Sequence, residues 1–448
     1  MLRPLRNSAR LFRIAWVLAR HDALFPLENS GFSPVITRLC KLLAAQKHRH
    51  LRPGQRLANA LLDLGPTFIK LGQSFSTRSD LVGDEIAADL SNLQDNLPPF
   101  PTPVAHSIIL REFGKRADEL FSRFDDAPVA AASIAQVHYA VLADGHEVAV
   151  KILRPEVEAA FARDIELFFW LAGLADAKPH LRRFHLPETI ATFRDTVRME
   201  LDLRMEAAGA VELKRNTAND KGFYVPQVYW ETTSQQVLTL EWIHGTPIGQ
   251  LDKLDEKGFD RVKLVQQAAE AFFNQVYRDG FFHADLHPGN MFVRDNGDIA
   301  VVDFGIMGRI TLQERVYLAE ILKGFLTEDF RHVAVMHFKA GYVPADKSVE
   351  NFTLACRAIA EPILGKPLNE ISVAKLLAQL FKVAENFEME AQPQLLLLQK
   401  TMMVAEGVGR MLNPNINMWQ LAEPLVLDWV GQNLGPRAKM REMAHGAE

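Results

Sequence analysis

At 448 residues, of which 48% are hydrophobic and 23% charged, the chain is long enough to need two or more lobes of a globular fold. Its two cysteines, Cys40 and Cys356, lie far apart and imply neither a disulfide framework nor a zinc cluster, which favours a reducing compartment. Eleven basic and two acidic residues give the first 56 positions a net charge of +9, within a total of −5. A basic segment on an acidic body points to an anionic surface as partner.

Residues 8 to 20 are predicted to form a basic amphipathic helix. Apolar residues recur at helical spacing and arginines track another face: Leu11, Ile14, Ala15 and Leu18, and Arg6, Arg10, Arg13 and Arg20. Such a helix can lie in a bilayer interface with Phe12 and Trp16 near the headgroups, or pack its apolar stripe on the protein body. The start also resembles a mitochondrial transit peptide. No apolar run of eighteen residues exists, so no transmembrane helix is predicted in this chain.

A second helix is predicted to begin at Pro66. Lys70 and Gln73 are three residues apart and share one of its faces, and Gly72 between them permits close backbone approach. Taken alone, Lys70 is interpreted as a solvated surface charge. The segment from 96 to 103, NLPPFPTP, then marks the expected boundary before the core domain.

Residues 104 to 124 are expected to be helical, and a strand, a turn and a second strand follow. Asp144-Gly145 is the hairpin signal between the two strands. Apolar residues alternate along the second strand, at Val148, Val150 and Ile152. Lys151 closes the sequence VAVK, the kinase strand signature for the lysine that holds the α and β phosphates of the nucleotide.

The loop before this strand departs from the protein-kinase pattern. Protein kinases carry G-x-G-x-x-G-x-V there, and this chain has alanine at the glycine positions. Because alanine resists positive φ, the loop is expected to be stiff, with amides less free to fold over phosphate. The predicted nucleotide-binding residues of the loop are Val129, Ala130, Ala131, Ala132, Ser133, Ile134, Ala135, Gln136 and Val137.

Residues 187 to 215 are predicted to form one long helix that supplies the acid pairing with Lys151. Asp202 and Glu206 are four residues apart and would share a face, while Glu200 would point elsewhere.

Residues 235 to 243 are interpreted as the strand and hinge that join the lobes. Backbone groups from Thr239 onward, including those of Glu241 and Trp242, would then face adenine. A helix from about residue 260 to 279 is expected to lead into the next motif.

Residues 282 to 305, FHADLHPGNMFVRDNGDIAVVDFG, have the layout of a phosphoryl-transfer site. His283, Asp285 and Asn290 stand in the order of a kinase catalytic loop, and the DFG triplet at Asp303 follows a short apolar strand. Asp285 is placed to act on the nucleophile, and Asn290 and Asp303 to bind Mg²⁺ on the phosphates of ATP.

After the DFG triplet the chain is predicted to enter a helix almost at once, at residues 311 to 324, and to stay helical to 433. There is neither a long activation segment nor an A-P-E triplet. Because that segment forms the peptide platform of protein kinases, its absence argues against ordinary protein phosphorylation. Met402, Met403 and Met411 are interpreted as core-filling residues.

Together these residues resemble the UbiB family of atypical kinase-like proteins linked to ubiquinone biosynthesis. The resemblance extends from about residue 10 to the end. Its motifs are KLGQ at Lys70, AAAS at Ala130, ELD at Glu200, HADLHPGN at His283 and DFG at Asp303.

The resemblance implies roles for single residues. Lys70 and Gln73 would lie over the nucleotide site as a gate, with Glu200 and Asp202 as anchors. Glu206 would pair with Lys151, so that the catalytic set is Asp285, Lys151 and Glu206, with Asn290 and Asp303 as metal ligands.

The implied fold is α+β and bilobal, like a protein kinase, with a small sheet-containing N-lobe and a mainly helical C-lobe. The expected divisions are a helical extension over 1–100, the N-lobe over 101–242 and the C-lobe over 243–448. The cofactors implied are ATP and Mg²⁺. The implied partners are an anionic membrane surface and quinone precursors or quinone-biosynthesis enzymes, with no nucleic acid; the oligomeric state stays open.

We therefore expect a peripheral protein on the cytoplasmic face of the inner membrane that hydrolyses ATP or phosphorylates a small molecule. Bacterial relatives often carry paired transmembrane helices at the carboxyl end, so this chain is either trimmed before that anchor or a member without it. Two alternatives stay open. One is a pseudokinase scaffold for quinone-biosynthesis enzymes, and the other is a soluble small-molecule kinase of the aminoglycoside or choline type, families that lack K-x-G-Q and the alanine-rich loop.

Overall fold

The computed structural model describes residues 2–24, 51–76, 82–91, 93, 97–176, 186–363, 379, 382–384, 386–389, 393–416 and 418–433. The chain divides into two compact units, Met1–Met205 with Val228–Trp242, and Glu206–Gln227 with Ile243–Glu448. A boundary between the units falls at residue 242, the expected end of the N-lobe. Glu206–Gln227, which we had assigned to that lobe, groups with the second unit.

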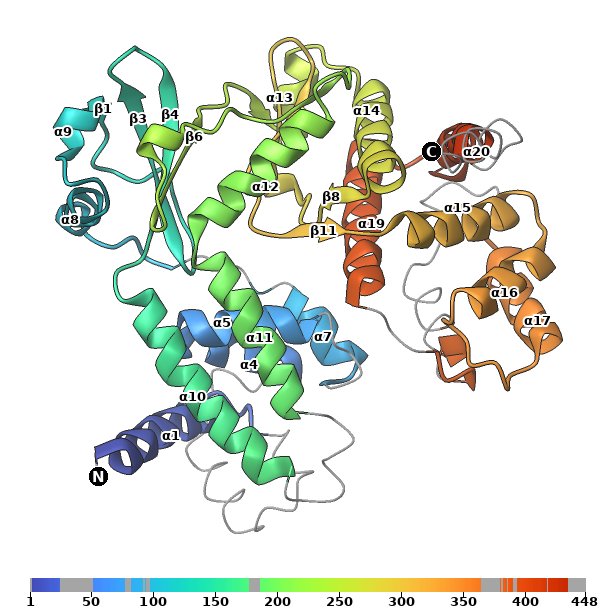
Figure 1. The fold of residues 1–448 in the computed structure, drawn as a ribbon, viewed down its shortest axis with the longest axis horizontal. Coiled ribbons are helices and arrows are strands. Elements are labelled where there is room, and N and C mark those ends of the chain that lie inside the picture. Colours follow the sequence, from blue (N-terminus) through green and yellow to red (C-terminus); the bar gives the residue numbers. More distant parts are fainter. Residues whose placement is uncertain are drawn as a thin grey trace, which may run out of the picture. The chain divides into compact units, whose positions relative to one another are not determined.

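The first unit combines helices with one antiparallel sheet (Figure 1). Its helices are α1 (Leu2–Arg20), α4 (Pro53–Leu64), α5 (Pro66–Ser76), α7 (Asp84–Ser91), α8 (Thr102–Phe113), α9 (Ala117–Leu120), α10 (Val157–Asp176) and α11 (Leu186–Glu200), with a 3₁₀ turn η3 (Trp230–Thr232). Helices α4, α5 and α7 pack on one another, and α10 packs on α11. The close approach predicted at Gly72 is present, because a Cβ there would lie 2.6 Å from Leu61 Cδ1.

The sheet of the first unit has the order β1-β3-β4-β6, with a short strand β2 paired to β3. The strands are β1 (Phe121–Phe124), β2 (Ala130–Ala131), β3 (Ala135–Leu142), β4 (Glu147–Leu153) and β6 (Val237–Glu241). The predicted hairpin is confirmed, with Gly145 at φ 91° in its turn. Val148, Val150 and Ile152 are fully buried, in one core with Ile108 and Ile109 of α8.

The prediction of helix throughout residues 104 to 124 is wrong. Helix α8 ends at Gly114, which caps it in the left-handed conformation with φ 65° and donates its N–H to the Leu110 carbonyl. After the short α9, residues 121 to 124 form strand β1 beside β3. Pairing with a neighbouring strand therefore overrides local helical character here.

The single long helix predicted over residues 187 to 215 is also wrong. It is two helices, α11 and α12 (Leu203–Asn216), with a break at Asp202. The Asp202 carboxylate accepts the Arg204 N–H at 3.1 Å, and the Leu203 N–H leaves the helical ladder to bind the Gln235 carbonyl at 3.0 Å. Asp202 thus lies outside both helices, and its expected place on one helical face with Glu206 does not hold.

The basic helix predicted over residues 8 to 20 is present as α1, but its faces differ from the expectation. Arg10 turns inward, where its guanidinium makes two 2.8 Å hydrogen bonds to Asp164 of α10 and lies over the Phe68 ring. Phe12 and Trp16 lie on the exposed part of the helix, at 74% and 44% exposure. Across the described parts of the chain, no helix is both long and apolar enough to cross a membrane.

The second unit begins near the start of α12 and is mainly helical. Its helices are α13 (Leu251–Glu256), α14 (Arg261–Phe273), the π-helix η4 (Asn274–Asp279), the 3₁₀ turn η5 (Pro288–Asn290), α15 (Leu312–Leu326), α16 (Phe330–Lys339), α17 (Val349–Ala360), α19 (Pro393–Leu412) and α20 (Met418–Asn433). Its strands are β5 (Phe223–Tyr224), β7 (Thr246–Pro247), β8 (Phe281–His283), β9 (Met291–Val293), β10 (Ile299–Val301) and β11 (Met307–Arg309). They form one sheet in the order β5-β10-β9-β7 and an antiparallel pair of β11 with β8.

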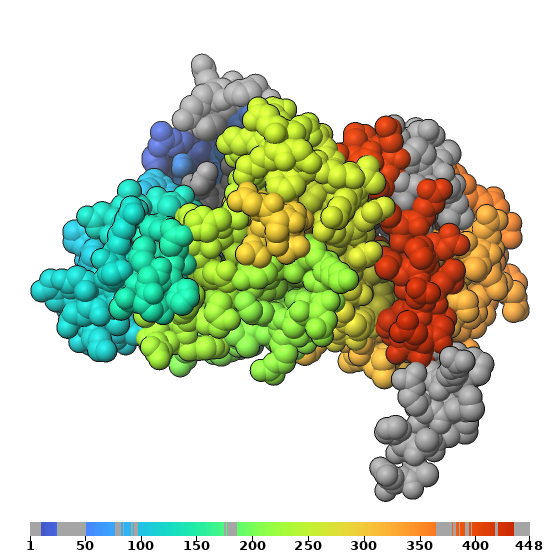
Figure 2. Space-filling view, turned by 90° about the horizontal axis from the view of Figure 1, so that it is seen from above, coloured from blue at the N-terminus to red at the C-terminus, as the bar shows by residue number. Residues whose placement is uncertain are grey.

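The carboxyl-terminal helices close the core behind the β8–β11 pair. Leu398 of α19 and Val426 of α20 are buried together with Phe282, the residue before His283. Figure 2 shows these two helices, in red, at the surface of the unit. The interpretation of Met402 and Met403 as core residues is wrong, because their exposed fractions are 46% and 42%.

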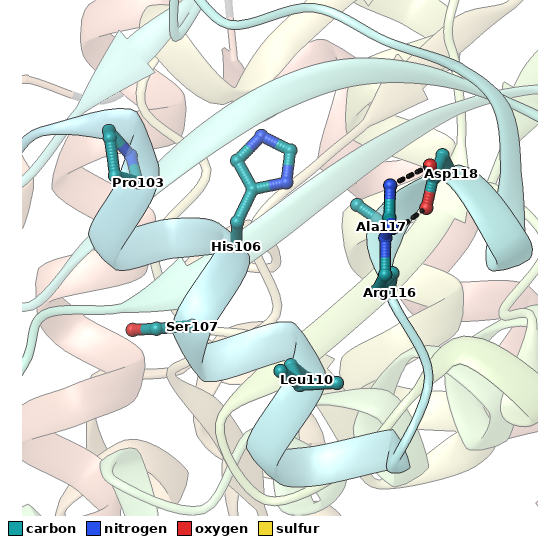
Figure 3. Close-up of a pocket in the computed structure, with 7 residues that line it drawn as sticks. All are labelled: Pro103, His106, Ser107, Leu110, Arg116, Ala117 and Asp118. Carbon is teal, nitrogen blue, oxygen red and sulfur yellow. Dashed lines mark hydrogen bonds and ion pairs between the residues drawn. The ribbon is translucent and has the colours of Figure 1, made fainter.

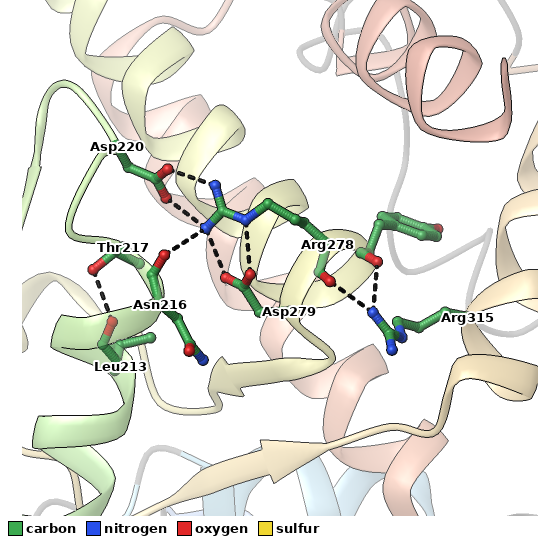
Figure 4. Close-up of polar contacts among 8 residues, drawn as sticks. Leu213, Asn216, Thr217, Asp220, Arg278, Asp279 and Arg315 are labelled. Carbon is green, nitrogen blue, oxygen red and sulfur yellow. Dashed lines mark hydrogen bonds and ion pairs between the residues drawn. The ribbon is translucent and has the colours of Figure 1, made fainter. Parts of the chain in front are cut away.

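A polar cluster holds the π-helix that leads into β8 (Figure 4). The Arg278 guanidinium binds the Asp220 carboxylate at 2.6 Å, the Asp279 carboxylate at 2.7 Å and the Asn216 carbonyl at 3.0 Å. These two carboxylates raise the pKa of Arg278, so it stays charged. Arg315 of α15 donates to the Arg278 carbonyl at 2.7 Å. Arg278 therefore ties the π-helix to the end of α12 and to α15, just before strand β8.

Candidate active site

The catalytic loop begins at the end of β8 and is fixed by hydrogen bonds within itself. The Asp285 N–H donates to His283 Nδ1 at 3.1 Å, and the Asn290 side-chain amide donates to the Asp285 carbonyl at 3.1 Å. His287 caps the 3₁₀ turn η5 by accepting the Gly289 N–H on its Nδ1. The three residues predicted from their order in the sequence are thus brought together.

His283 supports this loop from inside the core. Its side chain is fully buried and packs edge-on against Phe304, with ring centroids 5.6 Å apart. Burial lowers the pKa of His283, which keeps it neutral, with Nδ1 as the acceptor and the proton on Nε2. The His283 N–H in turn donates to Gln275 Oε1 of the π-helix at 3.0 Å.

Asn290 and Asp303, the predicted metal ligands, are adjacent in space. The Val302 N–H donates to the Asn290 carbonyl at 2.9 Å, which places Asp303 next to the end of η5. Asp303 adopts φ 64°, an unusual conformation for a residue with a Cβ, and its Oδ1 accepts the Gly305 N–H at 3.2 Å. One carboxylate and one amide oxygen suit Mg²⁺, which is held by few protein ligands together with phosphate oxygens. The residues therefore fit the ion, and their role as its ligands stays a prediction.

Glu206 lies buried beside the DFG triplet. Its Oε1 accepts the Phe304 N–H at 3.2 Å. This contact was not predicted from the sequence, because the two residues are 98 positions apart. Lys151 lies in the other unit, on β4 between Val137 and Leu238 of the neighbouring strands. The pairing of Lys151 with Glu206 stays a prediction.

The carboxylate of Asp285 also makes a contact that the sequence did not predict. Lys400 of α19 places its Nζ 3.2 Å from Asp285 Oδ1, and His287 Nε2 lies 3.8 Å from Oδ2. Lys400 is 115 residues from Asp285, and no local pattern around it marks it as part of the site.

In the first unit, the predicted nucleotide-binding loop is a tight hairpin between β2 and β3. The Val129 N–H donates to the Val137 carbonyl and the Ala132 N–H to the Ala135 carbonyl, both at 2.8 Å. The described residues with positive φ include no residue of this loop, in agreement with the expected effect of alanine. Ser133 is fully buried, and its Oγ has no hydrogen-bond partner among the described residues. A buried, unsatisfied hydroxyl in this loop fits a group that binds a ligand.

Arg154 and Gln136 hold this loop in place. The Arg154 guanidinium donates to the Ala132 carbonyl at 2.9 Å, and the Arg154 backbone N–H donates to the Ile134 carbonyl at 2.8 Å. Gln136 accepts the Phe100 N–H at 2.9 Å through Oε1 and donates through Nε2 to the Phe100 carbonyl at 3.3 Å. The loop is therefore held by fixed tertiary contacts.

The hinge residues end strand β6. Glu241 pairs with Val148, and the Trp242 N–H donates to the Glu147 carbonyl at 2.9 Å. The Trp242 amide is thus engaged in the sheet, and the contribution of both residues to adenine binding stays a prediction.

The residues predicted as a gate are brought together in part. Lys70 of α5 makes an ion pair with Glu200 at 2.9 Å, with only 13% of each side chain exposed. Gln73 lies on the same helix, one turn further on. Asp202, the second predicted anchor, makes a two-pronged ion pair with Arg204 at 2.8 and 2.7 Å, and those hydrogen bonds lower its pKa. The gating role of all four stays a prediction.

A pocket of about 350 Å³ lies between α8 and α9 (Figure 3). His106 and Leu110 line it from α8, and Arg116 faces it while paired with Asp118. None of the predicted site residues lines this pocket.

Comparison with known proteins agrees with this arrangement. Residues 92–337 match the ABC1 atypical kinase-like domain, and residues 356–417 match the UbiB helical domain. A protein of Marinobacter nauticus named probable protein kinase UbiB is 42% identical over 97% of this chain and 81% of its own length. A protein of the same name from Azotobacter vinelandii is 44% identical over 86% and 73%.

A solved structure shows the same fold. The Mycobacterium tuberculosis protein solved in complex with erythromycin covers 73% of this chain and 83% of its own, at 25% identity, with a TM-score of 0.58. The predicted kinase-like α+β fold is thereby confirmed. With a kinase-like domain over more than half of its length and a UbiB helical domain after it, the chain belongs to the UbiB family of atypical kinase-like proteins.

Proposed function

We propose that this protein is an ATP-dependent phosphotransferase or ATPase that acts at an anionic membrane surface in support of ubiquinone biosynthesis. The observation that carries the proposal is the catalytic loop. Hydrogen bonds join Asn290 to Asp285, and Val302, the residue before Asp303, to Asn290. The three residues follow one another in the order of a kinase catalytic site. The link to ubiquinone rests on the family to which the chain belongs.

The proposed chemistry gives each of these residues a role. Asp285 would accept the proton of the attacking hydroxyl, and Asn290 and Asp303 would hold Mg²⁺, which when bound would neutralise charge on the phosphates. Lys151 binds the α and β phosphates, and Glu206 orients Lys151 while holding the Phe304 amide. Ser133 offers its buried Oγ to the nucleotide as a hydrogen-bond donor.

The acceptor we propose is water or a small hydroxyl compound. Only Ile306 to Thr311 separates the DFG triplet from α15, and Met307 to Arg309 of that segment pair with β8 as strand β11. So short a paired segment leaves no platform for a peptide. The Lys70–Glu200 ion pair, in the predicted gate, is the second feature we assign to exclusion of protein substrates.

Helix α1 is the part we assign to the membrane surface. Phe12 and Trp16 are one turn apart and exposed, and the Arg20 guanidinium lies over the Trp16 ring. Exposed aromatic residues beside arginines on a basic segment suit an anionic bilayer interface. Arg10 is occupied with Asp164, so the helix stays attached to α10 while this face is available.

The decisive experiment is Mg²⁺-dependent ATP hydrolysis with and without phosphatidylglycerol vesicles. We expect turnover by the wild-type protein that increases with vesicles, and a decrease in kcat of roughly 10²- to 10⁴-fold in Asp285→Asn, since general-base catalysis contributes about that much. Asp303→Asn should lose turnover because the metal ligand is lost. Equal rates in wild type and Asp285→Asn would contradict phosphoryl transfer at this site.

The membrane assignment has its own test. Phe12→Ala with Trp16→Ala should reduce co-sedimentation with phosphatidylglycerol vesicles and abolish their effect on turnover, with hydrolysis in buffer unchanged. Trp170→Ala, an equally exposed tryptophan on α10, is the matched control and should change neither. Full vesicle binding by the double variant would show that another surface contacts the lipid.

A further inference from the structure

The ion pair between Lys400 and Asp285 joins the catalytic loop to a part of the chain outside the kinase-like domain. Asp285 lies within residues 92–337, which match that domain, and Lys400 lies within residues 356–417, which match the UbiB helical domain. Their charged atoms, Nζ and Oδ1, are 3.2 Å apart. The carboxylate we assign to the general base is therefore contacted by a helix that the kinase-like domain does not itself supply.

The position of Lys400 is set by the core on either side of it. Leu398 is buried in the same cluster as Phe282 and Ala284, the latter directly before Asp285. Thr401 is fully buried and donates its hydroxyl to the Leu397 carbonyl at 2.8 Å. The buried residues before and after it fix the backbone of Lys400, and its ammonium reaches the catalytic loop.

This ion pair contributes too little stability to explain its placement. The side chains of Lys400 and Asp285 are 34% and 29% exposed, and ion pairs with such access to water contribute little to stability. The same exposure means that a substrate or a water molecule can reach the carboxylate. A partly exposed ion pair at a general base is thus better suited to catalysis than to folding.

The two carboxylate oxygens of Asp285 differ in their surroundings. Oδ1 faces the Lys400 ammonium at 3.2 Å, while Oδ2 has His287 Nε2 at 3.8 Å, beyond hydrogen-bond distance. The Lys400 ammonium is therefore the nearer of the two groups, and it faces one defined oxygen of the general base.

We propose that Lys400 is a positioning residue for phosphoryl transfer, an inference that rests on the function proposed above. By holding Oδ1, its ammonium fixes the rotamer of Asp285 and leaves Oδ2 for the acceptor. Oδ2 takes the proton as the acceptor oxygen bonds to the γ-phosphorus and the bond from that phosphorus to the leaving oxygen of ADP breaks. The UbiB helical domain thereby completes the catalytic loop of the kinase-like domain.

The test compares the steady-state ATP hydrolysis of Lys400→Met and Lys400→Arg in the full chain. For Lys400→Met we expect kcat to fall by about 10- to 100-fold, because misplacing a catalytic group by about 1 Å costs up to that much, with KM for ATP changed less than about three-fold. Lys400→Arg keeps the charge and should recover much of the kcat. Arg410→Met, which removes an exposed ion pair to Glu406 on the same helix, is the control and should behave as wild type.

The outcomes separate this inference from the proposed function. Wild-type kcat in Lys400→Met, while Asp285→Asn is inactive, would overturn the role of Lys400 alone. The same would follow if Lys400→Arg lost as much kcat as Lys400→Met and both had a lowered Tm, because a structural role would then suffice. No Asp285-dependent hydrolysis by the wild type would overturn both proposals together.

Discussion

The predicted nucleotide-binding loop of the first unit and the candidate catalytic loop of the second are built in different ways. The catalytic loop keeps the kinase order of residues and is organised by bonds between near neighbours, such as His283 with Asp285 and Asn290 with Asp285. The alanine-rich loop departs from the kinase pattern and is braced by distant residues, with Arg154 on the Ala132 carbonyl and Gln136 on Phe100. The proposed catalytic residues thus lie in a segment organised by local hydrogen bonds, whereas the rigidity of the alanine-rich loop depends on tertiary contacts.

Among residues outside the catalytic loop itself, the largest effect on kcat is expected at Glu206, which contacts the DFG segment. Glu206→Ala should lower kcat for ATP hydrolysis by roughly 10²-fold, because the Phe304 N–H loses its acceptor and the DFG segment shifts. The unsatisfied buried amide should also cost about 1–3 kcal/mol of unfolding free energy, measured by urea denaturation.

Glu206→Gln provides the matched control for that variant. It keeps an oxygen for the Phe304 amide, so its stability should stay within about 1 kcal/mol of wild type. Its kcat should still fall, because the variant lacks the negative charge of the Glu206 carboxylate that we propose pairs with Lys151. Wild-type kcat in Glu206→Gln would argue against the Lys151 pairing and leave Glu206 with the Phe304 contact alone.

A smaller, about ten-fold effect on Mg-ATP affinity is expected from a change next to the alanine-rich loop. Arg154→Met removes the hydrogen bonds from the guanidinium to the Ala132 and Leu97 carbonyls. We expect Mg-ATP to bind about ten-fold more weakly, by calorimetric titration, and unfolding to cost about 1–2 kcal/mol less, since hydrogen bonds to charged groups are worth about that much. Arg123→Met, which removes an exposed ion pair to Asp125 on β1, should change neither quantity. Unaltered affinity in Arg154→Met would mean that the loop does not need this brace.

The two regions also contain buried histidines in opposite tautomers. His283 accepts the Asp285 N–H on Nδ1, whereas His138 accepts from Gln136 on Nε2 and donates from Nδ1 to the Asp125 carbonyl at 2.8 Å. Burial lowers the pKa of both below the ordinary value of 6.5, so both are neutral in the folded protein.

This neutrality predicts a pH dependence of stability. As the pH falls below about 6.5, the unfolded chain takes up protons that the folded chain does not, so the free energy of unfolding should decrease by up to about 1.4 kcal/mol per pH unit for each histidine. The decrease ends where the folded histidine itself protonates. Urea denaturation at pH 7.5, 6.5 and 5.5 measures this dependence, and His138→Gln should reduce its slope by the contribution of one histidine. An unchanged slope in His138→Gln would contradict the role of that residue.

These contrasts explain which features the sequence could predict. The catalytic loop, the β3–β4 hairpin and the start of helix α15 depend on spacings of two to five residues, so local patterns identify them. The break at Asp202 was missed because it depends on the Gln235 carbonyl, which the chain reaches only after folding. The contact of Lys400 with Asp285 and that of Glu206 with Phe304 were missed for the same reason, since only the fold brings these residues together.

The smallest effect, and the one that separates binding from folding in the alanine-rich loop, is expected for Ser133→Ala. The Ser133 Oγ is buried and makes no hydrogen bond to the described residues, so its removal should leave the stability of the ligand-free protein unchanged or raise it by up to about 1 kcal/mol. If that hydroxyl binds the nucleotide, the increase in Tm produced by saturating Mg-ATP should shrink in the variant by about 1–3 °C, measured by scanning calorimetry. A lower stability without ligand, together with a full nucleotide-induced increase in Tm, would show that Ser133 serves the packing of the loop. The alanine-rich loop would then bind the nucleotide through backbone groups alone, whereas the catalytic loop would act through its side chains.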